Sequence, residues 1–184
     1  MSCLYKRSLK CVIVGDEGVG KKNLVKAYCT SVLKVGNYSP DYPLVFVYTD
    51  TTTKRPLVPF SLVVGPEAKN LRILSYLKAD VVIICFPLDS PNSFDNVKTK
   101  WLPEVCQHCP NGSVIIAGIK SNTENELIEN TQAKELANSV NAKYFECSIF
   151  LIASLKKLID GAVCEADPPI AMQGFLTRVG GAVK

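Results

Sequence analysis

The residues with the clearest chemical capacity form a glycine-rich segment that ends in two lysines, Gly15 to Lys22. An apolar run, Cys11 to Val14, precedes this segment and predicts a buried strand, and apolar residues at helical spacing follow it. Strand, glycine loop and helix match the phosphate-binding loop G-x-x-x-x-G-K-[ST], whose backbone N–H groups and lysine hold phosphates. Gly15, Gly20 and Lys21 fit this motif.

Two residues of the loop act against this chemistry. The last motif position needs a hydroxyl that ligates Mg²⁺, but Lys22 stands there, and an ammonium group has no acceptor atom. Glu17 adds a carboxylate to a loop that should hold an anion, and like charges about 4 Å apart repel by about 4 kcal/mol at an effective dielectric constant of about 20. We therefore predict a phosphate loop in form only, without a metal site, in which Glu17 pairs with Lys21 or Lys22.

The composition bounds the class of protein. The 184 residues carry a net charge of +4, which is too weak and scattered to indicate nucleic-acid binding. We find no apolar stretch of membrane-spanning length, no secretory signal and no C-terminal prenylation box. The eight cysteines are expected to be reduced, and Cys106 and Cys109 lack the second ligand pair of a zinc site. We predict a cytoplasmic domain over residues 1–166, followed by a tail over 167–184.

Apolar runs and helical patterns alternate along the chain. Strands are predicted at 11–14, 44–49, 57–64, 81–86, 114–117 and 144–147, and helices at 21–32, 68–76, 131–140 and 151–164, with another helix beginning at Ser90 and Pro91. The second and third strands are too close for a crossover helix and should form an antiparallel hairpin. This alternation predicts an α/β fold with a doubly wound sheet, whose ligands bind beyond the carboxyl ends of the strands.

Several segments resemble the Ras superfamily and, within it, the Rho/Rac family. The most specific are Leu74–Tyr76, Ala79–Phe86, Ser90–Val97, Lys100–Val105 and His108–Asn111, and the likeness extends from about Lys10 to Cys164. The resemblance implies a small-GTPase fold, with a six-stranded, mostly parallel sheet, one antiparallel strand and about five helices. It also implies binding of GTP or GDP with Mg²⁺ and action on effectors of the actin cytoskeleton. The chain between Lys120 and Tyr144 is too short for the insert helix of Rho proteins, which we predict to be absent.

The resemblance also locates departures from the family's nucleotide chemistry. In the first switch, Asp41 follows Pro40 in place of a metal-binding Thr. In the second switch, Gly65 is kept, but Leu62 replaces an Asp and Pro66 replaces the Gln that positions water.

The base-binding motifs depart in the same way. Lys120 is kept, but Asn122 replaces a carboxylate that accepts two N–H bonds from guanine. Ser148 is followed by Ile149, whose branched side chain is expected to crowd the base. The degenerate nucleotide site is thus predicted to comprise Gly15, Glu17, Gly18, Gly20, Lys21, Lys22, Gly65, Lys120, Asn122, Ser148 and Ile149.

These departures predict a Rho-like pseudoGTPase that acts as a protein-interaction module in cytoskeletal signalling. We predict little or no GTP binding, no cofactor and no hydrolysis, so that the chain is not an enzyme, and partners among Rho-type regulators or effectors. The predicted partner face comprises Tyr38, Pro40, Tyr42, Leu44, Leu71 and Trp101. We interpret the helical stripe that contains Trp101 mainly as core packing and keep a partner surface as the alternative. The alternative function is an atypical switch in which Lys22 replaces the cation and GTP or GDP binds without Mg²⁺.

Overall fold

The computed structural model describes residues 8–36, 38–39, 43–48, 58–120 and 127–166. The strands are β1 (Leu9–Gly15), β2 (Leu44–Tyr48), β3 (Val58–Val64), β4 (Val81–Pro87), β5 (Ser113–Lys120) and β6 (Lys143–Ser148). The helices are α1 (Lys21–Ser31), α2 (Lys69–Ser75), α3 (Pro91–Asn96), the π-helical turn η1 (Val97–Trp101), α4 (Leu102–His108), α5 (Asn130–Ser139) and α6 (Ile152–Ala166). Since α3, η1 and α4 follow one another directly, they form one irregular helical segment.

The six strands form one sheet in the order β2-β3-β1-β4-β5-β6. β2 pairs antiparallel with β3, as the short connection predicted, and each of the other neighbouring pairs is parallel. The predicted small-GTPase architecture is confirmed. Because β1 lies between β3 and β4, the loops that follow these strands meet at one edge of the sheet, as in other doubly wound folds.

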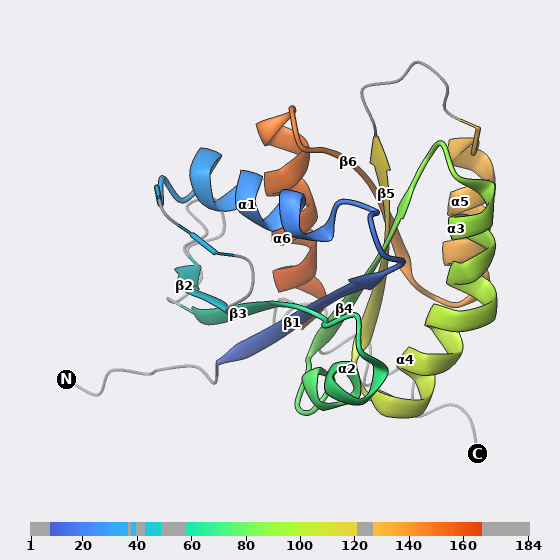
Figure 1. Ribbon diagram of the computed structural model, residues 1–184, viewed down its shortest axis with the longest axis horizontal. Coiled ribbons are helices and arrows are strands. Elements are labelled where there is room, and N and C mark those ends of the chain that lie inside the picture. Colours follow the sequence, from blue (N-terminus) through green and yellow to red (C-terminus); the bar gives the residue numbers. More distant parts are fainter. Residues whose placement is uncertain (1–7, 37, 40–42, 49–57, 121–126, 167–184) are drawn as a thin grey trace, which may run out of the picture.

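Helices cover both faces of the sheet (Figure 1). α1 and α6 pack on one face through a buried cluster that includes Leu24, Tyr28 and Leu158. α3, η1, α4 and α5 pack on the opposite face through a second cluster that includes Phe86 and Trp101. β1 and β4 supply alternating residues to both clusters, since successive side chains of a strand point to opposite faces.

The segment α3–η1–α4 begins as its sequence predicted. The Ser90 hydroxyl accepts a hydrogen bond from the backbone N–H of Ser93 at 3.3 Å, and Pro91 occupies the first turn. The apolar stripe along the segment is buried, which confirms the core-packing interpretation. Trp101 is 1% exposed, so the structure corrects its assignment to a partner face.

Two other sequence-based predictions concern the chain outside the regular elements. The insert helix was predicted to be absent between Lys120 and Tyr144. In this stretch, the described residues 127–142 contain the helix α5, and residues 121–126 lie outside the described part of the chain. The predicted tail 167–184 also lies outside them. Among the described helices, none has the length and apolar character that a bilayer crossing requires.

Candidate functional site

The glycine-rich loop joins the end of β1 to the start of α1, as the motif predicted. Gly15, Gly18 and Gly20 have φ values of 144°, 78° and 93°, which side chains rarely adopt. A Cβ on Gly15 would also collide with the backbone carbonyl oxygen of Cys85 on the neighbouring strand β4. The backbone of the loop therefore requires glycine at these positions, two of which, Gly15 and Gly20, are glycines of the motif.

Lys21 is the buried cation of this loop, with only 5% of its side chain exposed. Its ammonium donates to the carbonyl oxygens of Gly15 at 2.8 Å and Asp16 at 2.6 Å. A third contact joins Lys21 Nζ to Glu67 Oε1 at 3.0 Å. Because an ammonium has three donors, these three oxygens match its full capacity.

Glu67 was missing from the sequence-based site, which assigned Glu17 as the partner of a loop lysine. The carboxylate on Lys21 instead comes from the loop that follows β3, whereas Glu17 is exposed at the rim of the loop. The order of strands and loops along the chain could have indicated this contact. Glu67 stands three residues after the end of β3, which pairs in parallel with β1, so both loops leave the same edge of the sheet.

A cavity of about 290 Å³ lies beside these residues and is lined by Glu17, Gly18, Gly20, Lys21, Lys22, Asn23 and Glu67. The family fold implies a magnesium ion together with a nucleotide, and the lining tests this implication. Lys22 places an ammonium in the lining where the motif has a metal-binding hydroxyl. Mg²⁺ requires oxygen ligands, so this side chain does not fit the metal.

A second cavity, of about 400 Å³, also borders the glycine-rich loop and shares Gly18, Gly20 and Asn23 with the first. Its lining is mainly apolar and comprises Gly18, Val19, Gly20, Asn23, Pro87, Asp89, Ile119, Lys120, Ile149 and Phe150. Lys120 pairs with Glu146 at 3.1 Å. Ile149 lines this cavity, and its predicted crowding of a base stays a prediction, while Asn122 lies outside the described residues.

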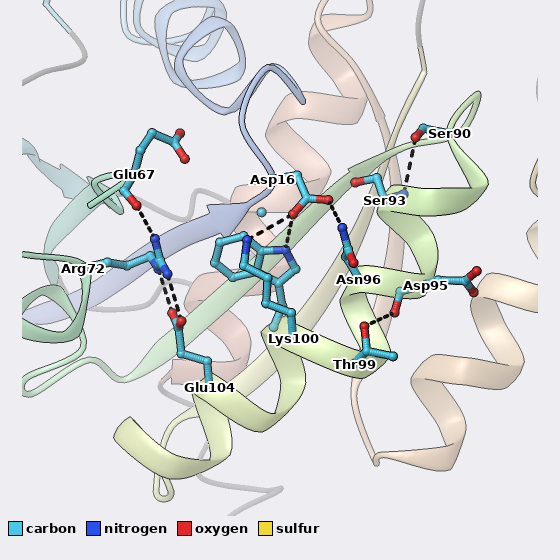
Figure 2. A network of polar contacts seen from close by, with 12 residues as sticks. Asp16, Glu67, Arg72, Ser90, Ser93, Asp95, Asn96, Thr99, Lys100 and Glu104 are labelled. Atoms are coloured by element: carbon cyan, nitrogen blue, oxygen red, sulfur yellow. Dashed lines mark hydrogen bonds and ion pairs between the residues drawn. The ribbon is translucent and has the colours of Figure 1, made fainter. Parts of the chain in front are cut away.

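The loop after β3 is attached to the helical segment by one buried arginine (Figure 2). Arg72 donates to Glu104 through Nε at 2.7 Å and through a terminal nitrogen at 2.9 Å. The other terminal nitrogen donates to the carbonyl oxygens of Pro66 at 3.2 Å and Glu67 at 2.7 Å. Tyr76 donates to the same glutamate at 2.8 Å. Hydrogen bonds from Arg72 hold the pKa of Glu104 below its usual value, against the opposing effect of burial.

Asp16 attaches the glycine-rich loop to the same helical segment (Figure 2). Its carboxylate accepts hydrogen bonds from Asn96 at 2.8 Å and from the Trp101 indole nitrogen at 3.0 Å, and Lys100 lies at 3.5 Å. Burial acts to raise the pKa of Asp16, but the hydrogen bonds from Asn96 and Trp101 outweigh it and lower the pKa. The two loops of the site thus share one support, because Arg72 lies 4.8 Å from the Trp101 ring centre.

Two further residues of the predicted site, Gly65 and Ser148, lie outside the glycine-rich loop. Gly65 donates its backbone N–H to Ile13 at 2.8 Å, and a Cβ there would lie 2.9 Å from Val14, so the kept glycine allows a close approach to β1. Ser148 Oγ accepts from the Phe150 N–H at 3.3 Å.

Of the predicted partner face, Leu71 is 57% exposed, whereas Tyr38 is half-buried against the core cluster of α1 and α6. Leu44 begins β2, and Pro40 and Tyr42 lie outside the described residues.

A family model agrees with this fold and loop geometry. The model of the Ras family matches residues 10–166, which is most of the 184-residue chain, so the chain belongs to the Ras family. The resemblance to the Ras superfamily is therefore confirmed. Membership implies small-GTPase signalling and interaction with protein regulators and effectors.

The same match corrects one prediction. We predicted from the altered motifs that the chain is not an enzyme. A Ras-family domain points to a GTPase, which is a hydrolase, and this contradicts the prediction. The altered residues do not outweigh a family match over this length.

Proposed function

We propose that this chain is a Rho-like member of the Ras family that signals through protein–protein contacts in the cytoplasm, in pathways of the actin cytoskeleton. Residues 1–166 form its signalling domain. Its nucleotide site is degenerate, with weakened affinity for GTP and GDP and without a functional Mg²⁺ site. The observation that carries the nucleotide part of this proposal is the ion pair between Lys21 and Glu67.

The ion pair weakens phosphate binding for a simple reason. A phosphate that approaches Lys21 has to displace the Glu67 carboxylate, since the other two ammonium donors are already used within the loop. Until Glu67 moves, its negative charge also repels the phosphate. The Lys22 ammonium adds positive charge but cannot ligate the metal that normally neutralises the terminal phosphates.

The partner side of the proposal is supported by an exposed apolar row beside the same loop. Leu71 and Leu74 lie one turn apart on α2 and are 57% and 58% exposed, and Leu77 just beyond the helix is 62% exposed. Large apolar side chains gathered in one place on a surface often mark a protein contact. We assign this row, together with the loop that carries Glu67, to the binding of Rho-type regulators or effectors.

Calorimetric titration of GDP and GTP into nucleotide-free protein, with and without Mg²⁺, tests the nucleotide part of the proposal. We expect dissociation constants weaker than about 1 µM, which corresponds to less than about 8 kcal/mol of binding free energy. We also expect Mg²⁺ to leave them unchanged. Binding in the nanomolar range that depends on Mg²⁺ would overturn this part.

Binding to purified Rho-type regulator and effector domains tests the partner part. We expect the double variant Leu71→Ser/Leu74→Ser to lose binding to any domain that the unmodified protein binds. Leu127→Ser is the matched control, because Leu127 is 61% exposed but precedes α5. Equal loss in both variants would contradict the assignment of the α2 row.

A second candidate is a switch that binds GTP or GDP without Mg²⁺. It is favoured by two of the cavities that border the glycine-rich loop, of about 290 and 400 Å³, and by Lys22 in the lining of the first. In this case nucleotide should remain on the protein through purification in EDTA. Chromatography of the denatured protein detects such nucleotide, and its absence would exclude this candidate.

A further inference from the structure

We propose that Arg72 and Trp101 are positioning residues that hold Glu67 on Lys21, so that the helical segment α3–η1–α4 controls access to the phosphate-binding lysine. This inference rests on the proposed function, because it concerns the regulation of the same site. The control is intramolecular, and the group that blocks the lysine is a carboxylate of the loop after β3.

The glutamate side of the ion pair is set by Arg72. The guanidinium is 5% exposed and directs two of its nitrogens at Glu104. This orientation leaves one terminal nitrogen directed at the carbonyl oxygens of Pro66 and Glu67. The backbone at Glu67 is therefore fixed by a buried group, while its side chain, 48% exposed, reaches Lys21.

The lysine side of the ion pair is set by Trp101. Its indole nitrogen donates to the Asp16 carboxylate, and the backbone carbonyl of Asp16 accepts from Lys21. Asn96, from the same helical segment, donates to the other carboxylate oxygen. Since Arg72 lies against the Trp101 ring, both halves of the ion pair are supported by one buried side chain.

This arrangement has a regulatory consequence. Glu104 and Trp101 touch neither Lys21 nor a nucleotide cavity in the described structure, yet they determine whether the lysine is available. A partner that draws the loop after β3 away from Arg72 would release Glu67 and expose the lysine to an anion. The same contact would thus change protein binding and phosphate affinity together.

Inorganic pyrophosphate and GDP, each titrated in EDTA into the full chain, provide the test. Glu67→Gln removes the blocking charge, and we expect it to raise both affinities about tenfold. The double variant Arg72→Met/Glu104→Leu removes the buried pair without leaving an unpaired charge, so that the fold is kept. We expect the same gain in this variant, and no further gain when Glu67→Gln is added, because all three changes act through one contact.

A loss of folding cannot imitate this result, because a merely structural role would not raise an affinity. Glu165→Gln is the control: it breaks the Lys143–Glu165 ion pair of 2.6 Å, which lies outside this network, and should leave both affinities unchanged. If Arg72→Met/Glu104→Leu binds pyrophosphate as the unmodified protein does, or if the gains add fully, the positioning role is overturned. Tight Mg²⁺-dependent binding by the unmodified protein would instead overturn the proposed function.

Discussion

Two ion pairs of this protein use similar groups in different surroundings. Arg72 and Glu104 are 5% and 8% exposed, share two hydrogen bonds and receive a third from Tyr76. Lys21 and Glu67 are 5% and 48% exposed and meet through one contact of 3.0 Å. The first pair is enclosed and cannot exchange its partner for water, whereas the second has one member that water and solutes can reach.

This difference in burial separates structural from functional roles. A buried charge that loses its partner cannot be solvated, so breaking the Arg72–Glu104 pair should cost folding free energy. The exposed Glu67 can be solvated when it leaves Lys21, so breaking that pair should cost little stability and should release a cation for binding. Substitutions in each ion pair test this difference.

The largest effect is expected from Trp101→Ala, because this side chain supports both loops. It removes a side chain that is 1% exposed and leaves Asp16 without one of its donors. We expect a loss of about 4 kcal/mol in the free energy of unfolding. Urea unfolding followed by circular dichroism measures it, with Leu127→Ala as an exposed control that should change by less than about 0.5 kcal/mol. A loss below about 1 kcal/mol would show that Trp101 is not a central support.

Removing one member of the enclosed pair should be nearly as costly. We expect Glu104→Ala to lower the free energy of unfolding by about 3 kcal/mol, because Arg72 then remains buried without a counter-charge. Arg72→Met/Glu104→Leu should recover most of this loss in the same urea experiment. Equal losses in the single and double variants would mean that packing, and not the unpaired charge, carries the cost.

The enclosed pair should also make stability depend on pH in the acid range. The pKa of Glu104 is lowered in the folded protein, chiefly by Arg72, so the folded state binds this proton less readily than the unfolded chain. Its contribution is therefore complete above the ordinary glutamate pKa of about 4.3 and is lost as the pH falls through the lower folded-state pKa. Unfolding midpoints measured from pH 6 downward, with pH values spaced by roughly half a unit, should fall less steeply in Arg72→Met/Glu104→Leu. Identical slopes in the two proteins would contradict this assignment.

The smallest change in stability is expected from Glu67→Gln. Its carboxylate is half-exposed, and exposed ion pairs contribute about 0–1 kcal/mol. We expect a change within about 0.5 kcal/mol in urea unfolding, in contrast to the change in anion affinity. A loss above about 2 kcal/mol would place this pair with the enclosed one and remove the basis of the comparison.

Local patterns in the sequence were sufficient for most of the fold. Apolar runs predicted β1 and β4, the Ser90–Pro91 start predicted α3, and the glycine spacing predicted the loop between β1 and α1. These features depend on neighbours in the chain, since strand burial, helix capping and glycine turns are local. The altered motifs, however, led to a wrong prediction about enzyme class, because single contacts do not define the family of a whole domain.

Which charged side chains pair depends on contacts between segments that are distant in the chain. Glu17 is four residues from Lys21 in the chain, yet the carboxylate that pairs with Lys21 belongs to Glu67. Arg72 pairs with Glu104, 32 residues further along. Likewise, the spacing of apolar residues in the α3–η1–α4 segment allowed a buried or an exposed stripe. The packing of this segment in the fold leaves Trp101 buried. The presence of a lysine in a glycine-rich loop at this edge of the sheet follows from the local sequence pattern. Which carboxylate reaches that lysine depends on parallel pairing of β1 with β3, because this pairing brings distant loops to one edge.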